Sequence, residues 1–186
     1  MGTLLRPRPF LWRAGVPVLL LLVLLAYALL SGRHEDKRLI DASGRRVFVA
    51  DGDTLKIGRQ VIRLAGADAV ESAQFCTDAR GIGWSCGESA LKALEAVVAK
   101  GDLRCAGLNR DSYGRIVARC TVAGEGDVSA AMVAGGWAVS DRGGRYSVQE
   151  EAARTARRGI WVGAFEAPAV WRVRHGVTPK IVRAAE

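Results

Sequence analysis

Histidine is scarce in this sequence, and closely paired cysteines are absent. The chain has two histidines among its 186 residues, and its four cysteines form no CxxC pair. A structural zinc site, which needs four ligands at short spacings, is therefore disfavoured. No internal repeat or low-complexity run occurs either. The length suffices for one domain with a hydrophobic core, but not comfortably for two.

Charge is missing from one long stretch near the N-terminus, residues 14–30. Basic residues flank this run on both sides: Arg6, Arg8, Arg13, Arg33, Lys37 and Arg38. The run is at the short end of what crosses a bilayer, and the preceding positive charge keeps that end in the cytoplasm. We therefore expect a membrane anchor over residues 14–31, within a segment 1–38 that ends in a linker.

A cleaved signal peptide is the alternative for this segment, because Ala26-Tyr27-Ala28 resembles a small-x-small cleavage site. Both interpretations export the rest of the chain. The expected location is the bacterial inner membrane with the domain in the periplasm, or a periplasmic or secreted protein if the signal is cleaved.

The four cysteines agree with export, since disulfides persist in oxidising compartments. They permit three pairings. Cys105 and Cys120 flank a turn signal at nearly equal distances, so an antiparallel hairpin would place them opposite each other. Cys76 and Cys86 would then close their own loop. Free thiols in a cytosolic protein are the alternative.

The net charge of the chain is +8, from 27 basic and 19 acidic side chains. Residues 1–38 account for six basic and two acidic ones, which leaves 21 and 17 for residues 39–186. A basic domain suits a polyanionic partner such as nucleic acid. Charge alone would also fit simple solubility.

Hydrophobic periodicity predicts a mixed domain over residues 39–172, followed by a tail over 173–186. Five alternating segments indicate strands at 46–50, 54–57, 61–67, 103–108 and 116–122. Helical patterns follow at 88–100, 127–135 and 147–158, with Asp127 and Ser147 as expected N-caps. The fold class is mainly β (α+β): a five-stranded OB-fold-like barrel with about three flanking helices, preceded by the N-terminal transmembrane or signal helix.

Several charged residues are not explained by these elements. They stand at strand ends, at turns or inside an apolar run: Asp51, Asp53, Arg63, Asp68, Glu71 and Arg115. Carboxylate oxygens suit a hard cation, and the planar fork of arginine suits a phosphate. A further carboxylate near such a cation can activate a water. Taken singly, each residue also has a plainer interpretation as a turn or a solvated loop.

The motifs in their order resemble the staphylococcal nuclease (thermonuclease) family over residues 47–161. The resemblance rests on Val49-Ala50-Asp51-Gly52-Asp53-Thr54, on Ile62-Arg63-Leu64 followed by Asp68 and Glu71, on Asp111-Ser112-Tyr113-Gly114-Arg115, and on Arg158-Gly159-Ile160-Trp161. One such motif alone would be a weak signal. Three in the right order, separated by a helix of the right length, are specific.

The resemblance implies a calcium-dependent phosphodiesterase that hydrolyses DNA or RNA and leaves 3′-phosphates. Asp53 and Asp68 match the Ca²⁺-binding carboxylates, and Ala69 matches the residue whose backbone carbonyl binds the same ion. Glu71 matches the candidate general base. The remaining matches are two phosphate-binding arginines, a tyrosine at the nucleotide pocket and a carboxylate beside the metal: Arg63, Arg115, Tyr113 and Asp51.

Two departures from the family pattern concern the segment around Glu71. The family usually has a Thr-Pro-Glu run, whereas this chain has Ala69-Val70-Glu71. The change keeps the backbone carbonyl of Ala69, but the loss of proline gives more freedom to the loop that orients Glu71. An insert over residues 72–87, with Cys76 and Cys86, follows the expected site, and we expect it to reshape substrate access.

Two other functions stay open at this stage. One is a non-catalytic nucleic-acid-binding module of the cell envelope, built on the same barrel. The other is a membrane-anchored structural domain, which leaves Arg63 among apolar neighbours without a reason. The expected partners are nucleic acid as substrate and the membrane through residues 14–31, with the domain acting as a monomer.

Overall fold

The computed structural model describes residues 21, 23 and 39–176. The expected anchor or signal at residues 14–31 lies outside this part of the chain, apart from Leu21 and Val23. Within the described part, no helix has the length and apolar character needed to cross a membrane.

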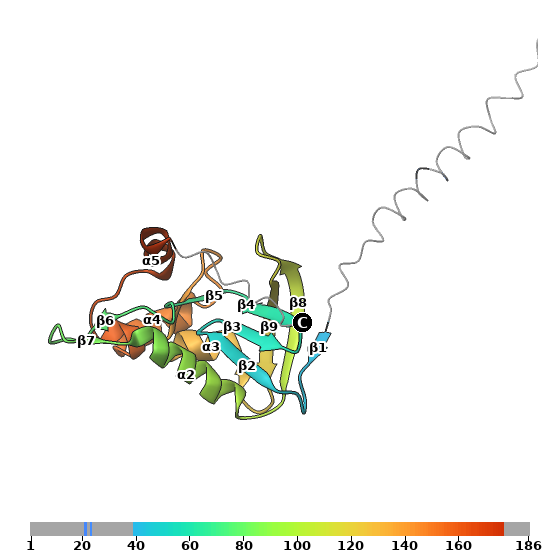
Figure 1. Cartoon of the computed structure of the whole chain (residues 1–186), viewed down its shortest axis with the longest axis horizontal. Helices are drawn as coiled ribbons and strands as arrows, with labels where there is room; N and C mark the ends of the chain where they lie inside the picture. The colour runs from blue at the N-terminus through green and yellow to red at the C-terminus, as the bar shows by residue number, and fades with distance from the viewer. Residues whose placement is uncertain (1–20, 22, 24–38, 177–186) are drawn as a thin grey trace, which may run out of the picture. The chain divides into compact units, whose positions relative to one another are not determined.

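A curved sheet forms the centre of the domain, with the strand order β1-β8-β9-β4-β3-β2 and β10 beside β9 (Figure 1). The strands are β1 (Leu39–Asp41), β2 (Val47–Asp51), β3 (Thr54–Ile57), β4 (Gln60–Leu64), β8 (Leu103–Arg110), β9 (Ile116–Val122) and β10 (Gly126–Asp127). All neighbours are antiparallel except β4 and β9. The five predicted strands are confirmed as β2, β3, β4, β8 and β9. The fold is mixed α+β and consistent with an OB-like fold, and β1 and β10 were not predicted.

Alternating side chains explain why these segments form the sheet. In β9 every second residue is buried, from Ile116 to Val122. Leu55 of β3 and Ile62 of β4 are fully buried and meet Leu94 in the same core. Alternation of this kind places one face of each strand on the core.

The predicted strand 61–67 is wrong at its end. Strand β4 stops at Leu64, and Gly66 turns the chain with φ +83°, a conformation that favours glycine. Strand β5 (Ala67–Ala69) then leaves the central sheet and pairs with β11 (Ala138–Ser140). This turn is what moves Asp68 away from the sheet and toward the charged cluster described below.

Four α-helices lie in the described part of the chain: α2 (Cys86–Val98), α3 (Val128–Ala134), α4 (Ser147–Thr155) and α5 (Pro168–His175). A 3₁₀ turn, η1 (Gly159–Val162), precedes α5. The Asp127 cap is confirmed, since its carboxylate accepts a bond of 3.0 Å from the Ala130 amide. The Ser147 cap is off by one residue, because Ser147 is already helical and follows Tyr146. Helix α5 was not predicted; it belongs to the same compact unit as the sheet.

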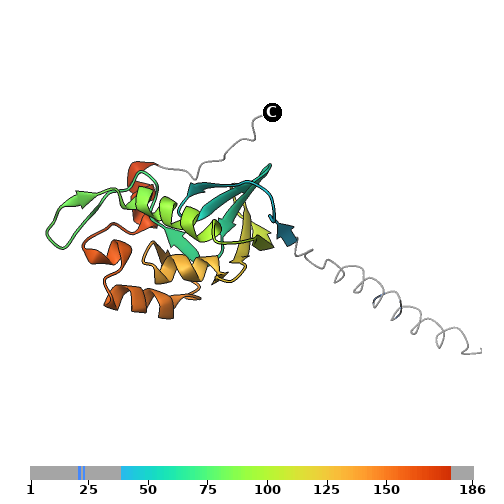
Figure 2. The same ribbon diagram turned by 90° about the horizontal axis from the view of Figure 1, so that it is seen from below.

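Both predicted disulfides are present. Cys105 and Cys120 face each other across β8 and β9, and Cys76 is bonded to Cys86. The second bond closes the insert, whose short strands β6 (Cys76–Thr77) and β7 (Gly83–Trp84) project from the domain beyond α2 (Figure 2).

The Cys105–Cys120 bond is expected to stabilise the domain against unfolding. Replacing both cysteines with alanine should lower the free energy of unfolding by about 3 kcal/mol, because the bond closes a loop with a sequence separation of 15. Urea denaturation of the oxidised protein and of the double variant measures the difference. Equal denaturation midpoints would contradict the expectation.

Candidate active site

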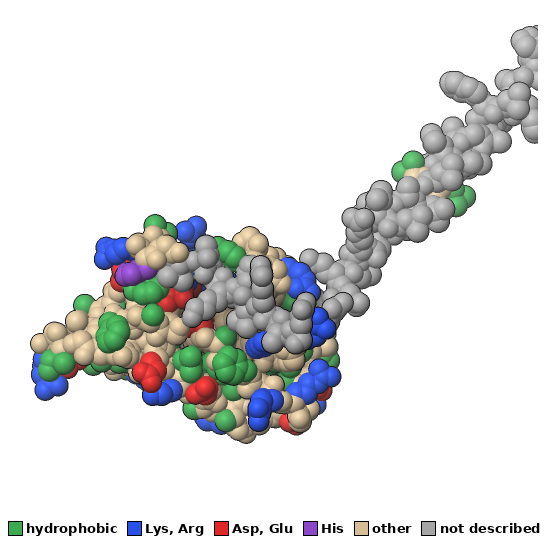
Figure 3. Space-filling view, in the orientation of Figure 1, with side chains coloured by type: hydrophobic (Ala, Val, Ile, Leu, Met, Phe, Trp, Pro, Cys, Tyr) green, Lys and Arg blue, Asp and Glu red, His purple; other side chains and the backbone are tan. Residues whose placement is uncertain are grey.

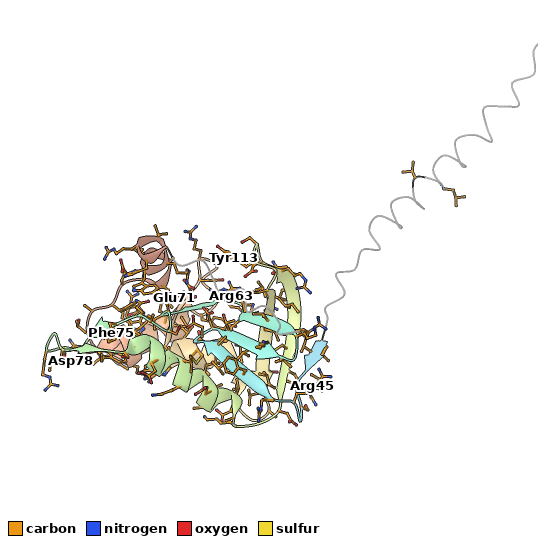
Figure 4. The ribbon with its side chains drawn as sticks, in the orientation of Figure 1. Arg45, Arg63, Glu71, Phe75, Asp78 and Tyr113 are labelled. Atoms are coloured by element: carbon orange, nitrogen blue, oxygen red, sulfur yellow. A yellow bond between two sulfur atoms is a disulfide. The ribbon has the colours of Figure 1, made fainter. Side chains whose placement is uncertain are left out.

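Most of the charged residues singled out in the sequence line one cavity of about 830 Å³, whereas Asp68 is not part of its lining. Six of its lining residues were predicted as site residues: Asp51, Asp53, Arg63, Glu71, Tyr113 and Arg115. Helix α5 supplies part of the opposite wall, including Trp171 and Arg172. Figure 4 shows Glu71 below α5, with Arg63 beside it and Tyr113 above Arg63.

Arg63 lies between two carboxylates, those of Asp53 and Asp68. Strands β3 and β4 pair Thr54 with Arg63, and this register brings Arg63 next to Asp53. Its Nη1 contacts Asp53, and its Nη2 lies 2.7 Å from Asp68 Oδ1. The paired carboxylates outweigh the cost of burial and raise the pKa of Arg63. The isolated charge of the sequence therefore serves as the shared partner of two acids.

Asp53 is a buried carboxylate with several donors. Burial opposes its charge, but Arg63 and hydrogen bonds from the Ala69 amide (3.1 Å) and the Thr54 hydroxyl (2.9 Å) hold its pKa below the usual value. The Ala69 bond also places the backbone of β5 directly beside Asp53. The two expected Ca²⁺-binding carboxylates and the residue with the expected carbonyl ligand are thus close together.

Asp51, at the end of β2, is an acid with a strongly raised pKa. Burial, followed by the nearby charges of Asp53 and Glu71, raises the pKa of Asp51 to about 8. With every group ionised, four carboxyl groups and two paired guanidinium groups leave an excess of two negative charges: Asp51, Asp53, Asp68, Glu71, Arg63 and Arg172. A divalent cation would balance this excess and would favour the ionised form of Asp51.

The donor set is of the kind that a hard cation prefers, since it consists of carboxylate and backbone oxygens. However, in the described part of the chain no three Asp, Glu, His or Cys side chains gather closely enough to define a metal centre by themselves. Arginine side chains take up the carboxylate oxygens instead. The calcium site and the roles of its ligands stay predictions.

Arg115 and Tyr113 reach the cavity from the turn between β8 and β9. Asp111 holds this turn, because its Oδ1 accepts bonds from the amides of Tyr113 (3.0 Å) and Arg115 (2.9 Å). Its other oxygen lies 2.7 Å from Arg115 Nε. The guanidinium of Arg115 also lies 5.7 Å from the centre of the Tyr113 ring. The motif thus delivers both residues to the cavity as a single unit.

Glu71 stands in the loop after β5, where it contacts a residue that sequence reasoning missed. Its Oε1 lies 2.7 Å from Nη1 of Arg172, and Arg172 also binds Asp68. The sequence did contain a signal for the helix that carries this arginine. Pro168 stands at its first turn, and Gly176 ends it in the left-handed conformation.

Carboxylates and arginines that meet in one cavity on a curved OB-like sheet define a site suited to a cation and a phosphate together. The chain matches the family of staphylococcal nuclease homologues over residues 61–163, more than half of its length. The chain therefore belongs to the staphylococcal nuclease family, as the motifs predicted.

Two relatives show how far this similarity extends. Over 117 residues the chain is 37% identical to the succinoglycan biosynthesis protein ExoI of Rhizobium meliloti (strain 1021), a match that covers 61% of each chain. Over 135 residues it is 30% identical to the probable endonuclease LCL3 of Schizophyllum commune (strain H4-8 / FGSC 9210), which covers 61% of this chain and 45% of that protein. The matches thus span less than two thirds of both relatives. Family membership and the second relative support a nuclease-like function.

Proposed function

We propose that this protein is a calcium-dependent nuclease that hydrolyses phosphodiester bonds of DNA or RNA and leaves 3′-phosphates. One observation carries the proposal. A single cavity contains the candidate base Glu71, the Asp53–Arg63 pair and the phosphate-binding candidate Arg115. Membership of the staphylococcal nuclease family supports it.

The residues fit a divalent cation on charge and on donor type. Asp53, Asp68 and the backbone carbonyl of Ala69 would hold Ca²⁺, with Asp51 beside it. When bound, the ion would supply a positive charge that polarises the phosphate and favours loss of a proton from a nearby water. The lowered pKa of Asp53 favours the charged form that a cation needs as a ligand.

The protein side chains would divide the remaining work. Arg63 and Arg115 grip the phosphate and stabilise the added negative charge of the five-coordinate transition state. Glu71 accepts a proton from the attacking water. The water oxygen forms a bond to phosphorus while the bond from phosphorus to the 5′ oxygen breaks, and the 5′ oxygen takes up a proton from solvent water. The phosphate is left on the 3′ side. Tyr113, which is partly exposed at the cavity, borders the nucleotide.

Export of the domain is part of the proposal. The uncharged run with its basic flanks suits an inner-membrane anchor or a signal peptide, and the two disulfides suit an oxidising compartment. The domain would then act in the periplasm or outside the cell, as a monomer.

Cleavage of single-stranded DNA and of RNA by the full chain, purified oxidised in mild detergent, tests the proposal. With Ca²⁺ we expect cutting, which stops when excess chelator is added and returns when Ca²⁺ is restored. Products should carry 3′-phosphates. The products should therefore accept a label at their 3′ ends only after a phosphatase has removed the phosphate and exposed the 3′-hydroxyl. Binding without cutting in both buffers would instead favour the non-catalytic binding module. The Ala69-Val70 departure would then be the first candidate cause of the lost activity.

A further inference from the structure

Arg172 of helix α5 joins two functional carboxylates with one guanidinium group. Its Nη1 lies 2.7 Å from Glu71 Oε1 and 3.0 Å from Asp68 Oδ1, and its Nη2 lies 3.0 Å from Asp68 Oδ2. The grip on Asp68 is bidentate, which adds directional restraint to charge attraction. The Arg172 side chain is only 22% exposed, so the contact is partly shielded from solvent.

The segment around Arg172 is tied to the Glu71 loop at two more points. Gln74, which is fully buried, accepts a bond from the Glu71 amide and donates one of 2.6 Å to the Glu166 carbonyl. The Thr77 amide donates to the Ala164 carbonyl at 2.8 Å. Residues 164–175 therefore follow the loop from Glu71 to Thr77, although the family match ends at residue 163.

The loop that carries Glu71 has little restraint of its own on the position of the Glu71 side chain. Ala69-Val70 precedes Glu71, so no proline ring limits the backbone at that point. Asp68 and Glu71 are also like charges, which repel each other when they are brought together. A guanidinium between them opposes that repulsion and fixes their separation.

We propose that Arg172 is a positioning residue that holds Glu71 at a fixed place beside Asp68. The role of Glu71 as the base rests on the proposed function. The restraint itself does not, since it is a property of the loop that is measured without substrate.

The central experiment compares Arg172→Ala with the wild-type full chain in the single-stranded DNA assay. We expect kcat to fall roughly tenfold to a hundredfold, as a small misplacement of a catalytic group produces, with KM nearly unchanged. Free guanidinium ion, added well below denaturing concentrations, should restore part of kcat. A rise in KM at constant kcat would overturn the proposal and make Arg172 a phosphate-binding residue.

Arg174→Ala is the matched control. Arg174 is on the same helix but largely exposed, and it pairs with the Glu166 side chain on the surface. We expect wild-type kcat for this variant. If Arg172→Ala is slow without guanidinium rescue and its thermal midpoint falls far below that of Arg174→Ala, the arginine only docks the helix, and the proposal fails.

Amide hydrogen exchange provides a readout that needs no activity. Exchange at Glu71 and Gln74, both of which donate within this loop, should be faster in Arg172→Ala and unchanged in Arg174→Ala. If the wild type does not cleave nucleic acid, the proposed function is wrong. Hydrogen exchange then tests by itself whether Arg172 restrains the Glu71 loop. Equal exchange in both variants would overturn the positioning role.

Discussion

Replacing Glu71 with glutamine should remove most of the turnover and leave the fold intact. An amide has the shape of the carboxyl group and still offers an oxygen to Arg172, which binds Glu71 Oε1 at 2.7 Å. It does not accept a proton at neutral pH, so general-base catalysis is lost. Positioned general bases contribute roughly 10²- to 10⁴-fold, and we expect a decrease in kcat within that range.

The matched control for this prediction is Glu88→Gln. Glu88 is an exposed glutamate of α2 that pairs with Lys92 on the surface. We expect wild-type kcat for Glu88→Gln and thermal midpoints close to the wild type for both variants. Single-turnover cleavage of a labelled oligonucleotide measures the chemical step directly. A wild-type rate in Glu71→Gln would refute the assignment of Glu71 as the base.

Replacing Gly87 with alanine should damage both stability and catalysis, because Gly87 lies against the backbone of the Glu71 loop. An added Cβ would stand 1.8 Å from the Glu71 carbonyl oxygen and 2.8 Å from the Ser72 carbonyl carbon. The neighbouring Cys86 is tied to Cys76, which restrains the start of α2. The Glu71 loop has to move instead.

We expect the free energy of unfolding to fall by about 1–3 kcal/mol, as overpacking in a core does. We also expect kcat to fall on the order of a hundredfold, because Glu71 would be misplaced. Gly83→Ala is the matched control in the same insert. Its added Cβ would come no closer than 4.0 Å to the Cys76 carbonyl oxygen, an ordinary contact.

Urea denaturation and single-turnover cleavage of both glycine variants measure the two effects. Gly83→Ala should behave as the wild type in each. If Gly87→Ala also keeps its stability and its rate, the close packing of α2 on the Glu71 loop does not restrain that loop in solution.

Figure 3, in the orientation of Figure 1, shows acidic side chains just below the position of helix α5. The site combines residues from nearby motifs with a residue of a distant helix, which is why it was only partly predictable. The acids and Arg63 come from short motifs near β2 to β5, where local spacing places them. Arg172 is separated by 104 residues from Asp68 and by 101 from Glu71, and no local pattern connects them.

The sequence by itself determined the five longest strands, three of the four described helices, both disulfides and most of the charged cluster. Each depends on local alternation, on a turn signal or on motifs close together in the chain, such as Asp51-Gly52-Asp53-Thr54. Tertiary structure decided the rest: the turn at Gly66 that carries Asp68 out of the sheet, and the return of α5 that brings Arg172 to Glu71. Such contacts depend on how the completed core positions distant segments, and hydrophobic periodicity does not specify that arrangement.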